Sequence, residues 1–490
     1  MFSSSLLFAL LLFQADAPAS LEALVREAQA DLKAERYLEA RQKLTRAVER
    51  NVRDPALWSY LGIAHERLNE FDQAIEAFRK AALLAPSDAQ TYLNLGLLYW
   101  RKGDVNESLD YYRKGLQLSP NDAKGNENYA LLLMRIGRYQ EAIDPLLRVK
   151  KEKPADLSIR VALIESFFRG GMLLEGETET QEVLNSRIAS PAEQVKLAVA
   201  LIEDSQPEMA EQALKKALSA EPNLGDGHGV LGLLYEKRGK YDQAAQELQR
   251  AVQLSPESLK YALALGQTLL MGRQYSEALA FLQSSQQRFG SSLEFRFKLA
   301  LSLYFSREYE KAALQLETLL TPPTPRLALV QFYLGNSYSA LGQLKKAELC
   351  YQQGIGNNPK KTANYIALAA LLRKPDVNRI EEAISNLQKV LQLNSTDRRA
   401  QLQLALCYES KEDALHALPV LEDVSRAHPD SITVHKALAR VYDRLGKKSE
   451  SAQESATVDQ LQARTNRTRA EFSDPLSQEF QDLAELANSK

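Results

Sequence analysis

Histidine and cysteine, the residue types that most often bind transition metals or act as nucleophile and base, are sparse in this chain, and their spacing suits neither role. The histidines, none of which pairs at metal-ligand spacing with a third ligand nearby, are His65, His228, His416, His428 and His435. The segment from Gly225 to Gly229 is rich in glycine, but it follows no predicted strand and so does not indicate a phosphate-binding loop. The motif sets of serine hydrolases, zinc proteases and protein kinases are missing. We therefore predict no catalytic residue, no metal site, no cofactor and no enzymatic activity.

Composition and charge exclude further classes of function. The chain has 490 residues, of which 45% are hydrophobic, enough for a continuous core. Its 61 basic and 63 acidic residues give a net charge of -2, without the basic surplus that binding to duplex nucleic acid usually requires. The two cysteines, Cys350 and Cys407, are too few for a disulfide framework. We expect both thiols to be small buried side chains, and we expect no nucleic-acid partner.

A fixed period of 34 residues runs along most of the chain, as the spacing of Pro86, Pro120 and Pro154 shows. Units of about this length can be laid out with only three extra residues in total. They begin at Leu21, Pro55, Ala89, Ala123, Leu157, Pro191, Gly225, Leu259, Leu293, Ala328, Thr362, Arg398 and Ile432. Such a period predicts a stacked array in which each unit buries its apolar face against its neighbours.

Each unit carries two helical patterns separated by a turn. In the second unit, Leu57, Leu61 and Ala64 recur at helical spacing, and Ala74 and Phe78 do so farther on. A glycine at one place between the patterns is expected to end the first helix in the left-handed conformation, and these glycines are Gly103, Gly137, Gly171, Gly239, Gly342 and Gly446. One position in the second helix is occupied by alanine in most units, and a small residue there predicts a close helix–helix approach. These alanines are Ala40, Ala74, Ala142, Ala210, Ala244, Ala278, Ala312, Ala347 and Ala417.

On these residues the chain resembles the tetratricopeptide repeat family. The best unit matches the spacings of that family at Trp58, Leu61, Gly62, His65, Ala74, Phe78, Ala81 and Pro86. The resemblance extends over roughly Leu21 to Val458. It implies an all-α fold, an α-solenoid in the form of a right-handed superhelix of about thirteen helix-turn-helix units, with a capping helix at the C-terminus.

The unit that begins at Leu157 departs most from the pattern. It has Gly176 at the alanine place and lacks the closing proline. This unit is either a hinge or a degenerate repeat, since arrays tolerate one poor member.

The two ends and one internal segment suggest how the chain is divided. A short apolar run followed by small residues makes residues 1–19 resemble a signal peptide, so we expect an exported protein, periplasmic or secreted. The run is too short to span a bilayer. The proline-rich segment from Thr321 to Pro325 predicts a stiff connector between repeat blocks at 20–324 and 325–458. Residues 459–490 are predicted to form a tail with a capping helix, or alternatively a segment that docks on a partner.

The resemblance implies that the first helix of each unit lines a concave face, where peptides or partner helices bind. The residues that it places on this face are Leu97, Trp100, Arg101, Leu131, Met134, Arg135, Phe168, Arg169, Phe297, Leu301, Tyr304, Phe305, Phe332 and Asn336. Large apolar groups interleaved with arginines suit a peptide-binding groove. The alternative is that these side chains pack against neighbouring units.

The expected function is therefore that of a non-enzymatic scaffold that binds partner proteins or extended peptides. The alternative is a regulatory or substrate-delivery subunit of an envelope or secretion enzyme complex carried on another chain. Some tetratricopeptide domains hold the C-terminal carboxylate of Hsp70 or Hsp90 with a Lys/Asn clamp. The corresponding places here are occupied by Ser59, Ile63, Leu93 and Leu97, so those chaperone tails are not expected ligands. Neither the partner nor the oligomeric state follows from the sequence.

Overall fold

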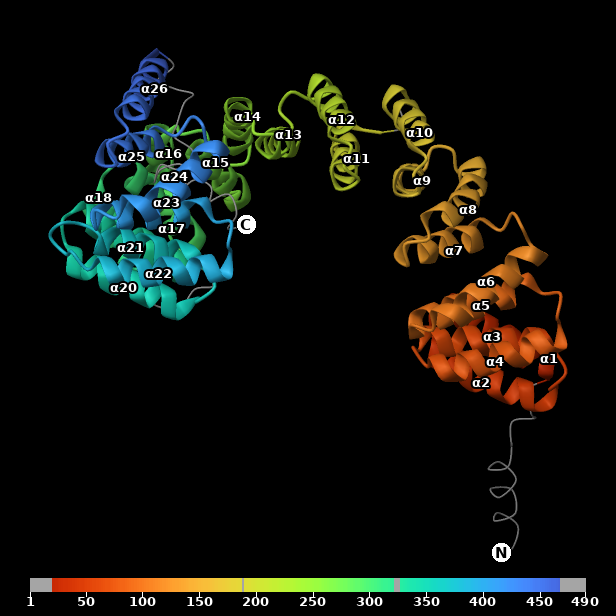
Figure 1. The fold of residues 1–490 in the computed structure, drawn as a ribbon. Coiled ribbons are helices and arrows are strands. Elements are labelled where there is room, and N and C mark those ends of the chain that lie inside the picture. Colours follow the sequence, from red (N-terminus) through yellow and green to blue (C-terminus); the bar gives the residue numbers. More distant parts are fainter. Residues whose placement is uncertain (1–19, 187–188, 321–326, 468–490) are drawn as a thin grey trace, which may run out of the picture. The chain divides into compact units, whose positions relative to one another are not determined.

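The computed structural model describes residues 20–186, 189–320 and 327–467, and these residues form helices and short connections without any strand. The chain divides into two compact bodies. We call residues 1–222 the N-terminal body and residues 223–490 the C-terminal body. In each body, the two helices of a unit pack side by side as an antiparallel hairpin (Figure 1).

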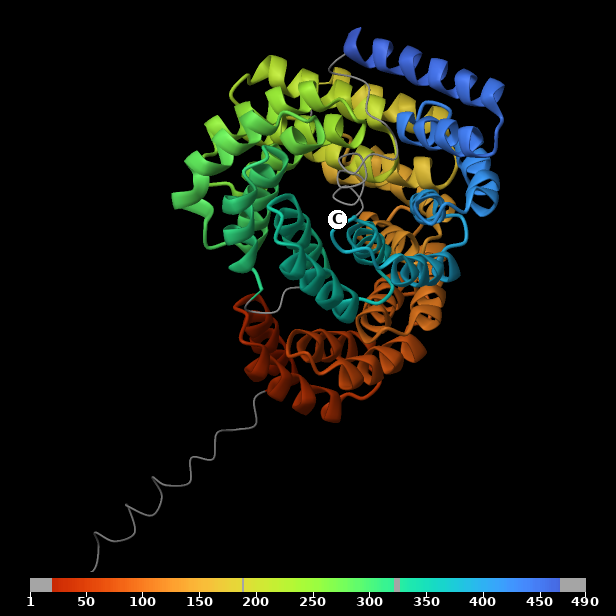
Figure 2. The ribbon, with the colours of Figure 1, turned by 60° about the vertical axis from the view of Figure 1, so that its left-hand side comes forward.

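The N-terminal body stacks its hairpins in chain order, as the ribbon shows from a second side (Figure 2). Its described helices are α1 (Leu21–Lys33), α2 (Tyr37–Arg50), α3 (Pro55–Arg67), α4 (Phe71–Leu84), α5 (Ala89–Lys102), α6 (Val105–Leu118), α7 (Ala123–Arg135), α8 (Tyr139–Glu152), α9 (Leu157–Arg169), α10 (Leu173–Asn185), α11 (Pro191–Glu203) and α12 (Pro207–Ala220).

The C-terminal body continues the same alternation of first and second helices. Its described helices are α13 (Gly225–Lys237), α14 (Tyr241–Leu254), α15 (Leu259–Met271), α16 (Tyr275–Phe289), α17 (Leu293–Phe305), α18 (Tyr309–Glu317), α19 (Leu327–Ala340), α20 (Leu344–Asn357), α21 (Thr362–Leu372), α22 (Ile380–Leu393), α23 (Arg398–Ser410), α24 (Ala414–Ala427), α25 (Ile432–Arg444) and α26 (Lys448–Arg467).

The predicted unit boundaries are confirmed almost to the residue. Twelve of the thirteen predicted unit starts are the first residue of a helix, and the remaining unit begins at Leu327 instead of Ala328. The prolines at the unit ends follow the second helices, as Pro86 follows α4 and Pro120 follows α6. Proline cannot continue a helix interior, so these residues stop one hairpin and allow the next to begin. The expected all-α solenoid is therefore confirmed.

The turn inside each hairpin has a residue in the left-handed region at one fixed place. The six predicted glycines adopt it, with φ between 70° at Gly239 and 86° at Gly103. In the other seven hairpins the same conformation is adopted by Glu35, Asn69, Ser205, Arg273, Arg307, Asn378 and Glu412. A left-handed residue other than glycine costs about 1–2 kcal/mol. Packing of the two helices therefore imposes the turn even where the residue itself disfavours it.

The position in the second helix that carries a small residue is the point where the two helices of a unit are in contact. All nine predicted alanines are completely buried. A small residue also lies opposite, in the first helix: a Cβ atom added to Gly62 would lie 2.8 Å from the Phe78 ring, and one added to Gly96 would lie 2.9 Å from Tyr112. In the third unit Ser108 replaces the alanine, and its hydroxyl donates to the Gly96 carbonyl over 2.7 Å. The predicted close approach is confirmed.

A larger side chain at this alanine position should destabilise the fold. We expect Ala244→Leu to lower the free energy of unfolding by about 1–3 kcal/mol, because extra methyl groups in a packed interior displace their neighbours. Ala244 is completely buried, and its carbonyl oxygen lies only 3.1 Å from the place where a Cβ of Gly232 would be. A thermal melt measures the loss. Gln243→Leu, at the exposed neighbouring position, is the control, and equal melting temperatures for the two variants would contradict this packing.

The glycine-rich start of α13 has a packing explanation. A Cβ atom on Gly229 would lie 2.2 Å from the ring of Tyr261, so only glycine admits that ring against α13. The Tyr261 hydroxyl then donates to the Asp226 carboxylate over 2.5 Å. Gly176 of the fifth unit is explained in the same way, since its Cβ would lie 2.9 Å from the Phe168 ring. Of the two interpretations of that unit, packing accounts for the glycine without a hinge.

Several expectations concern residues outside the described ranges. The predicted signal peptide (1–19), the block boundary at 324/325 and the predicted capping helix after Asp474 fall there and stay predictions. The expected end of the repeats at Val458 lies inside α26, which continues to Arg467 because no glycine or proline interrupts it. Val458 and Leu461 are both buried. Within the described residues, no helix combines the length and the apolar character that crossing a membrane requires.

A buried carboxylate in the first unit predicts sensitivity to acid. Asp31 is 3% exposed and accepts hydrogen bonds from Lys43 and Arg36, which lower its pKa below the usual 3.8. A carboxyl whose pKa is lower in the folded state stabilises the fold above its ordinary pKa, and this stability is lost as the pH falls below that value. We expect Asp31→Asn to reduce stability at neutral pH and to flatten its decline in acid. Unfolding by urea at a series of pH values tests this. If the free energy of unfolding fell equally with decreasing pH in the wild type and the variant, the prediction would be wrong.

Candidate peptide-binding groove

Within the described residues, no group of three or more metal-ligating side chains comes together. His65 and Glu70 are hydrogen-bonded over 2.6 Å, and His228 and Glu247 over 2.7 Å. Cys350 and Cys407 are buried and unbridged, as expected, and burial raises the pKa of each thiol to about 11. Thiols of such pKa stay protonated and unreactive at neutral pH.

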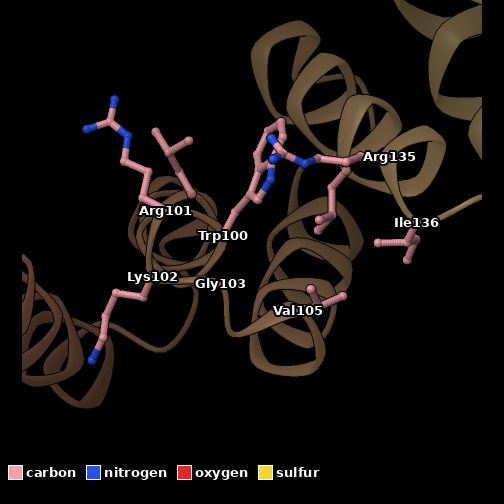
Figure 3. Close-up of a pocket in the computed structure, with 9 residues that line it drawn as sticks. Trp100, Arg101, Lys102, Gly103, Val105, Arg135 and Ile136 are labelled. Carbon is pink, nitrogen blue, oxygen red and sulfur yellow. The ribbon is translucent and has the colours of Figure 1, made fainter. Parts of the chain in front are cut away.

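A concave site in the N-terminal body is a pocket of about 640 Å³ between α5, α7 and the turn that follows α5 (Figure 3). It is lined by Leu97, Trp100, Arg101, Lys102, Gly103, Val105, Leu132, Arg135 and Ile136. The volume lies within the range of about 300–1,000 Å³ that is typical of ligand sites. Four of the lining residues, Leu97, Trp100, Arg101 and Arg135, were predicted for the concave face.

Helix α5 presents one side to the pocket because its other side is buried. The helix begins at the Asp88 cap, whose carboxylate accepts from the Gln90 amide, and its buried face includes Leu95 and Leu98. Gly96 lets the ring of Tyr112 from α6 lie directly on the helix backbone. Leu97, Trp100 and Arg101 follow one another at the i, i+3, i+4 spacing of a single helix face, and this face is left open.

Helix α7 and the turn after α5 supply the opposite wall. The Asp122 carboxylate caps α7 by accepting from the Gly125 amide over 2.6 Å, and Leu132 is buried in the third turn. Arg135 is the last residue of α7, so its side chain reaches the pocket mouth. In Figure 3, Trp100 and Arg135 extend toward one another from their helices, whereas Arg101 points away. The left-handed Gly103 brings the chain round to Val105.

The mouth of the pocket is basic. The Arg101 guanidinium pairs with Glu66 of α3 over 3.0 Å, and Lys102 pairs with Asp72 of α4 over 2.6 Å. That contact with Asp72 raises the pKa of the Lys102 ammonium. Arg135 is exposed and has no ion-pair partner among the described residues. The pocket therefore combines an indole and aliphatic groups with one guanidinium that is not neutralised.

The remaining predicted residues of this body differ in exposure. Leu131 is 41% exposed and Met134 is partly buried, so both are accessible on α7. Phe168, however, is 7% exposed because its ring fills the space beside Gly176. Arg169 is bound by Asp204 over 2.6 Å and by Glu165 over 3.3 Å. The expectation of an open groove residue is therefore wrong for Phe168, and Arg169 is held in an internal ion pair.

In the C-terminal body most predicted groove residues lie in the core. Phe297, Leu301 and Phe332 are at most 3% exposed and belong to one apolar cluster. Asn336 is 9% exposed, and its side-chain oxygen accepts from the Tyr351 hydroxyl over 2.8 Å. Here the alternative holds: these side chains pack between neighbouring helices, and they are not exposed anchors.

Tyr304 and Phe305 are the partly exposed members of the predicted set in the C-terminal body. Phe305 stacks on Tyr275 with ring centroids 5.1 Å apart, and Tyr304 meets Tyr333 edge to face at 5.4 Å. These contacts fix both rings within an aromatic cluster. A binding role for them stays a prediction.

The pocket also contains residues that the sequence analysis did not select. Lys102, Gly103, Val105, Leu132 and Ile136 line it, and most of them lie at the end of a first helix or in the turn beyond. The sequence-based prediction covered only the inward positions of the first helix. The recurrent glycine between the helices is a signal that could have identified Gly103 and its neighbours, because it marks where the turn closes over the groove.

Comparisons with known proteins agree with the repeat architecture. Family models described as "Tetratricopeptide repeat" match residues 25–89, 62–123, 93–156, 195–258, 229–292, 330–361 and 376–441, which together exceed half of the chain. No curated protein sequence matches the chain significantly.

Among solved structures, the chain is similar to yeast Tom70, with 16% identity and a TM-score of 0.38 over 96% of this chain and 99% of that one. It is similar to the Cut9–Hcn1 hetero-tetramer of the APC/C, with 14% identity and a TM-score of 0.41 over 99% of both chains. A third match is the Naa15/Naa10 complex bound to HypK-THB, with 15% identity and a TM-score of 0.37 over 96% of this chain and 80% of that one.

Proposed function

Because this chain belongs to the tetratricopeptide repeat family, we propose that it is a non-enzymatic scaffold whose N-terminal body binds a segment of a partner protein in the pocket between α5 and α7. Solenoids of this family typically bind protein partners and carry no catalytic centre. The observation that carries the proposal is the exposed side of Trp100 over an apolar floor, beside a guanidinium that has no internal partner.

The chemistry of this pocket suits an anchoring side chain. Tryptophan and arginine are the residues most often found to dominate binding energy at interfaces, where they lie in pockets that exclude water. Leu97, Val105 and Ile136 supply apolar surface around the indole of Trp100, and the Arg135 guanidinium can donate to a carboxylate or a backbone carbonyl. A partner segment satisfies both halves of the site when it inserts a large aliphatic or aromatic side chain and offers a carboxylate or a backbone carbonyl to Arg135.

The chain provides a specific optical probe of this site. It has two tryptophans, Trp58 and Trp100, and only Trp100 lines the pocket. In Trp58→Phe all indole fluorescence comes from Trp100. We expect peptides selected from a random displayed library on the full-length protein to shift this emission to shorter wavelength, because an apolar side chain displaces water from the indole.

A matched pair of variants separates pocket binding from adhesion to other apolar surface. Trp100→Glu should abolish binding of the selected peptides, because it places a carboxylate on the pocket floor. Leu83→Glu changes a residue of α4 that is 82% exposed and lies outside the pocket, so binding should persist. Selected peptides that bind wild type and Trp100→Glu equally would overturn the proposed site.

We further propose that the protein acts outside the cytosol, on the basis of the apolar run and small residues within 1–19. Sequencing the N-terminus of the protein from its native cells tests this, and a cytosolic chain that still begins at Met1 would refute it. Affinity purification from the exported fraction also distinguishes the two expected roles. Several partners fit a scaffold, whereas one dominant enzyme fits a regulatory or substrate-delivery subunit.

A further inference from the structure

Cationic side chains lie at the C-terminal ends of the first helices of units one to five. We call this set the basic row, and it consists of Lys33, Arg67, Arg101, Arg135 and Arg169. Its members are 34 residues apart and are the last or next-to-last residues of α1, α3, α5, α7 and α9. All five are exposed. The row ends at the sixth unit, where the equivalent residue is Glu203.

Helix-end electrostatics alone does not account for the basic row. Cations near a helix C-terminus are favoured by the helix dipole, typically by about 0.3–1 kcal/mol, and this preference applies to every helix. In the C-terminal body, α13 and α25 end at Lys237 and Arg444, but α15 ends at Met271, α17 at Phe305, α19 at Ala340 and α23 at Ser410. Among the described helices, cations at five consecutive units occur only in the N-terminal body, and this run calls for a local explanation.

Internal partners neutralise only part of this row. Arg101 pairs with Glu66, and Arg169 pairs with Asp204 and Glu165. Lys33, Arg67 and Arg135 have no ion-pair partner within the described part of the chain. These three side chains can donate to an external anion without first losing an internal contact.

Apolar side chains accompany the row on the same helix faces. Ile63, Leu97 and Leu131 each precede a cation of the row by four residues, which places the two on one side of the helix. Leu131 is 41% exposed, and Leu97 continues into the Trp100 pocket. The surface thus offers an apolar strip beside a basic strip.

We propose that the segment bound by the N-terminal body is an acidic peptide that carries large apolar side chains. This inference rests on the proposed function and adds the charge of the partner. Packed helices lie about 8–10 Å apart and an extended chain advances about 3.3 Å per residue, so an acidic side chain at about every third residue meets successive cations. Nucleic acid fits less well, because the apolar strip would stay uncovered and the chain has a net charge of -2.

Two synthetic dodecapeptides test the charge of the partner. One consists of four Asp-Ser-Leu repeats and the other of four Asn-Ser-Leu repeats, so they differ only in charge. Each is titrated into full-length Trp58→Phe while the Trp100 emission is followed. We expect the acidic peptide to bind about tenfold more tightly, and we expect the ratio to shrink as salt rises above physiological strength, where the Debye length is about 8 Å.

Arg135→Gln is the decisive variant. It should bring the affinity for the acidic peptide close to that for the neutral one, and it should weaken binding of the neutral peptide much less, because that peptide can lose only a backbone contact to Arg135. Arg46→Gln, at an exposed arginine of the second helix α2, is the matched control and should preserve the ratio. Equal affinities of wild type for both peptides would overturn the acidic partner while leaving the pocket proposal intact. Failure of both peptides to bind, or tighter binding of oligothymidylate than of the acidic peptide, would also overturn it, and the library selection decides separately on the pocket.

Discussion

Glu179→Ala is expected to lower the free energy of unfolding by about 3–5 kcal/mol, because it leaves a buried guanidinium without its main partner. The side chains of Glu179 and Arg160 are each only 6% exposed, and they form an ion pair between α10 and α9. Lys150 of α8 donates to the same carboxylate. Glu182 also contacts Arg160, over 2.9 Å, so the effect should fall toward the lower end of this range.

The effect should be confined to the neighbouring units, because each unit of an array contacts only the adjacent ones. Hydrogen–deuterium exchange of the full-length protein should show faster exchange in α8, α9 and α10 and unchanged exchange in α23 and α25. Glu182→Ala removes a carboxylate that is 55% exposed and should cost at most about 1 kcal/mol.

A double variant separates a lost charge partner from lost packing. Arg160→Met combined with Glu179→Leu removes both buried charges and keeps similar volumes, so it should recover most of the stability. If Glu179→Ala and Glu182→Ala have the same effect, or if the double variant is as unstable as Glu179→Ala, the buried pair does not have the role assigned to it.

Phe78→Ala should also destabilise strongly, by about 3–5 kcal/mol, through the cavity that the ring would leave. Phe78 is completely buried in α4, and its ring occupies the space opened by Gly62, where a Cβ atom would lie 2.8 Å from the ring. Phe78 thus packs between the two helices of the second unit at the point where small residues let them approach most closely. Collapse around the vacancy is limited because Ala74 and Ala81 on the same helix are already small and buried.

Leu83→Ala on the same helix is the matched control. Leu83 is 82% exposed, and its truncation should change stability by no more than about 0.5 kcal/mol. Urea unfolding and hydrogen exchange measured across α3 and α4 compare the two variants. A second test exploits the glycine: Gly62→Ala should be tolerated better in a Phe78→Leu background than in the wild type, because the smaller side chain leaves room for the new methyl group.

Two arginines of the basic row show how residues at equivalent positions acquire different roles. Arg135 and Arg169 occupy equivalent places one unit apart, yet Arg169 is bound by Asp204 and Glu165 while Arg135 reaches the Trp100 pocket. The difference comes from Asp204 in the next unit and from Glu165 four residues earlier on α9, since the place of Glu165 is occupied by Leu131 on α7.

The repeat architecture follows from the sequence itself because its causes are local and recur at a fixed spacing. Prolines that end helices, a small residue at the helix contact and apolar residues at helical spacing each act within one unit. These features located twelve of the thirteen unit starts and the buried alanines. The six glycine turns were also identified from residue type, since glycine alone adopts the left-handed conformation at little cost.

Only the tertiary structure decided which inward-facing residues form a site. Trp100 and Phe168 have the same place in their units, but Gly176 makes room for the Phe168 ring, whereas Trp100 lines an open pocket. Likewise, Arg273 adopts the left-handed turn because two packed helices require it, although its residue type disfavours that conformation. Exposure, ion pairing and strain depend on side chains contributed by neighbouring helices and units, and a periodic pattern read one unit at a time contains no information about them.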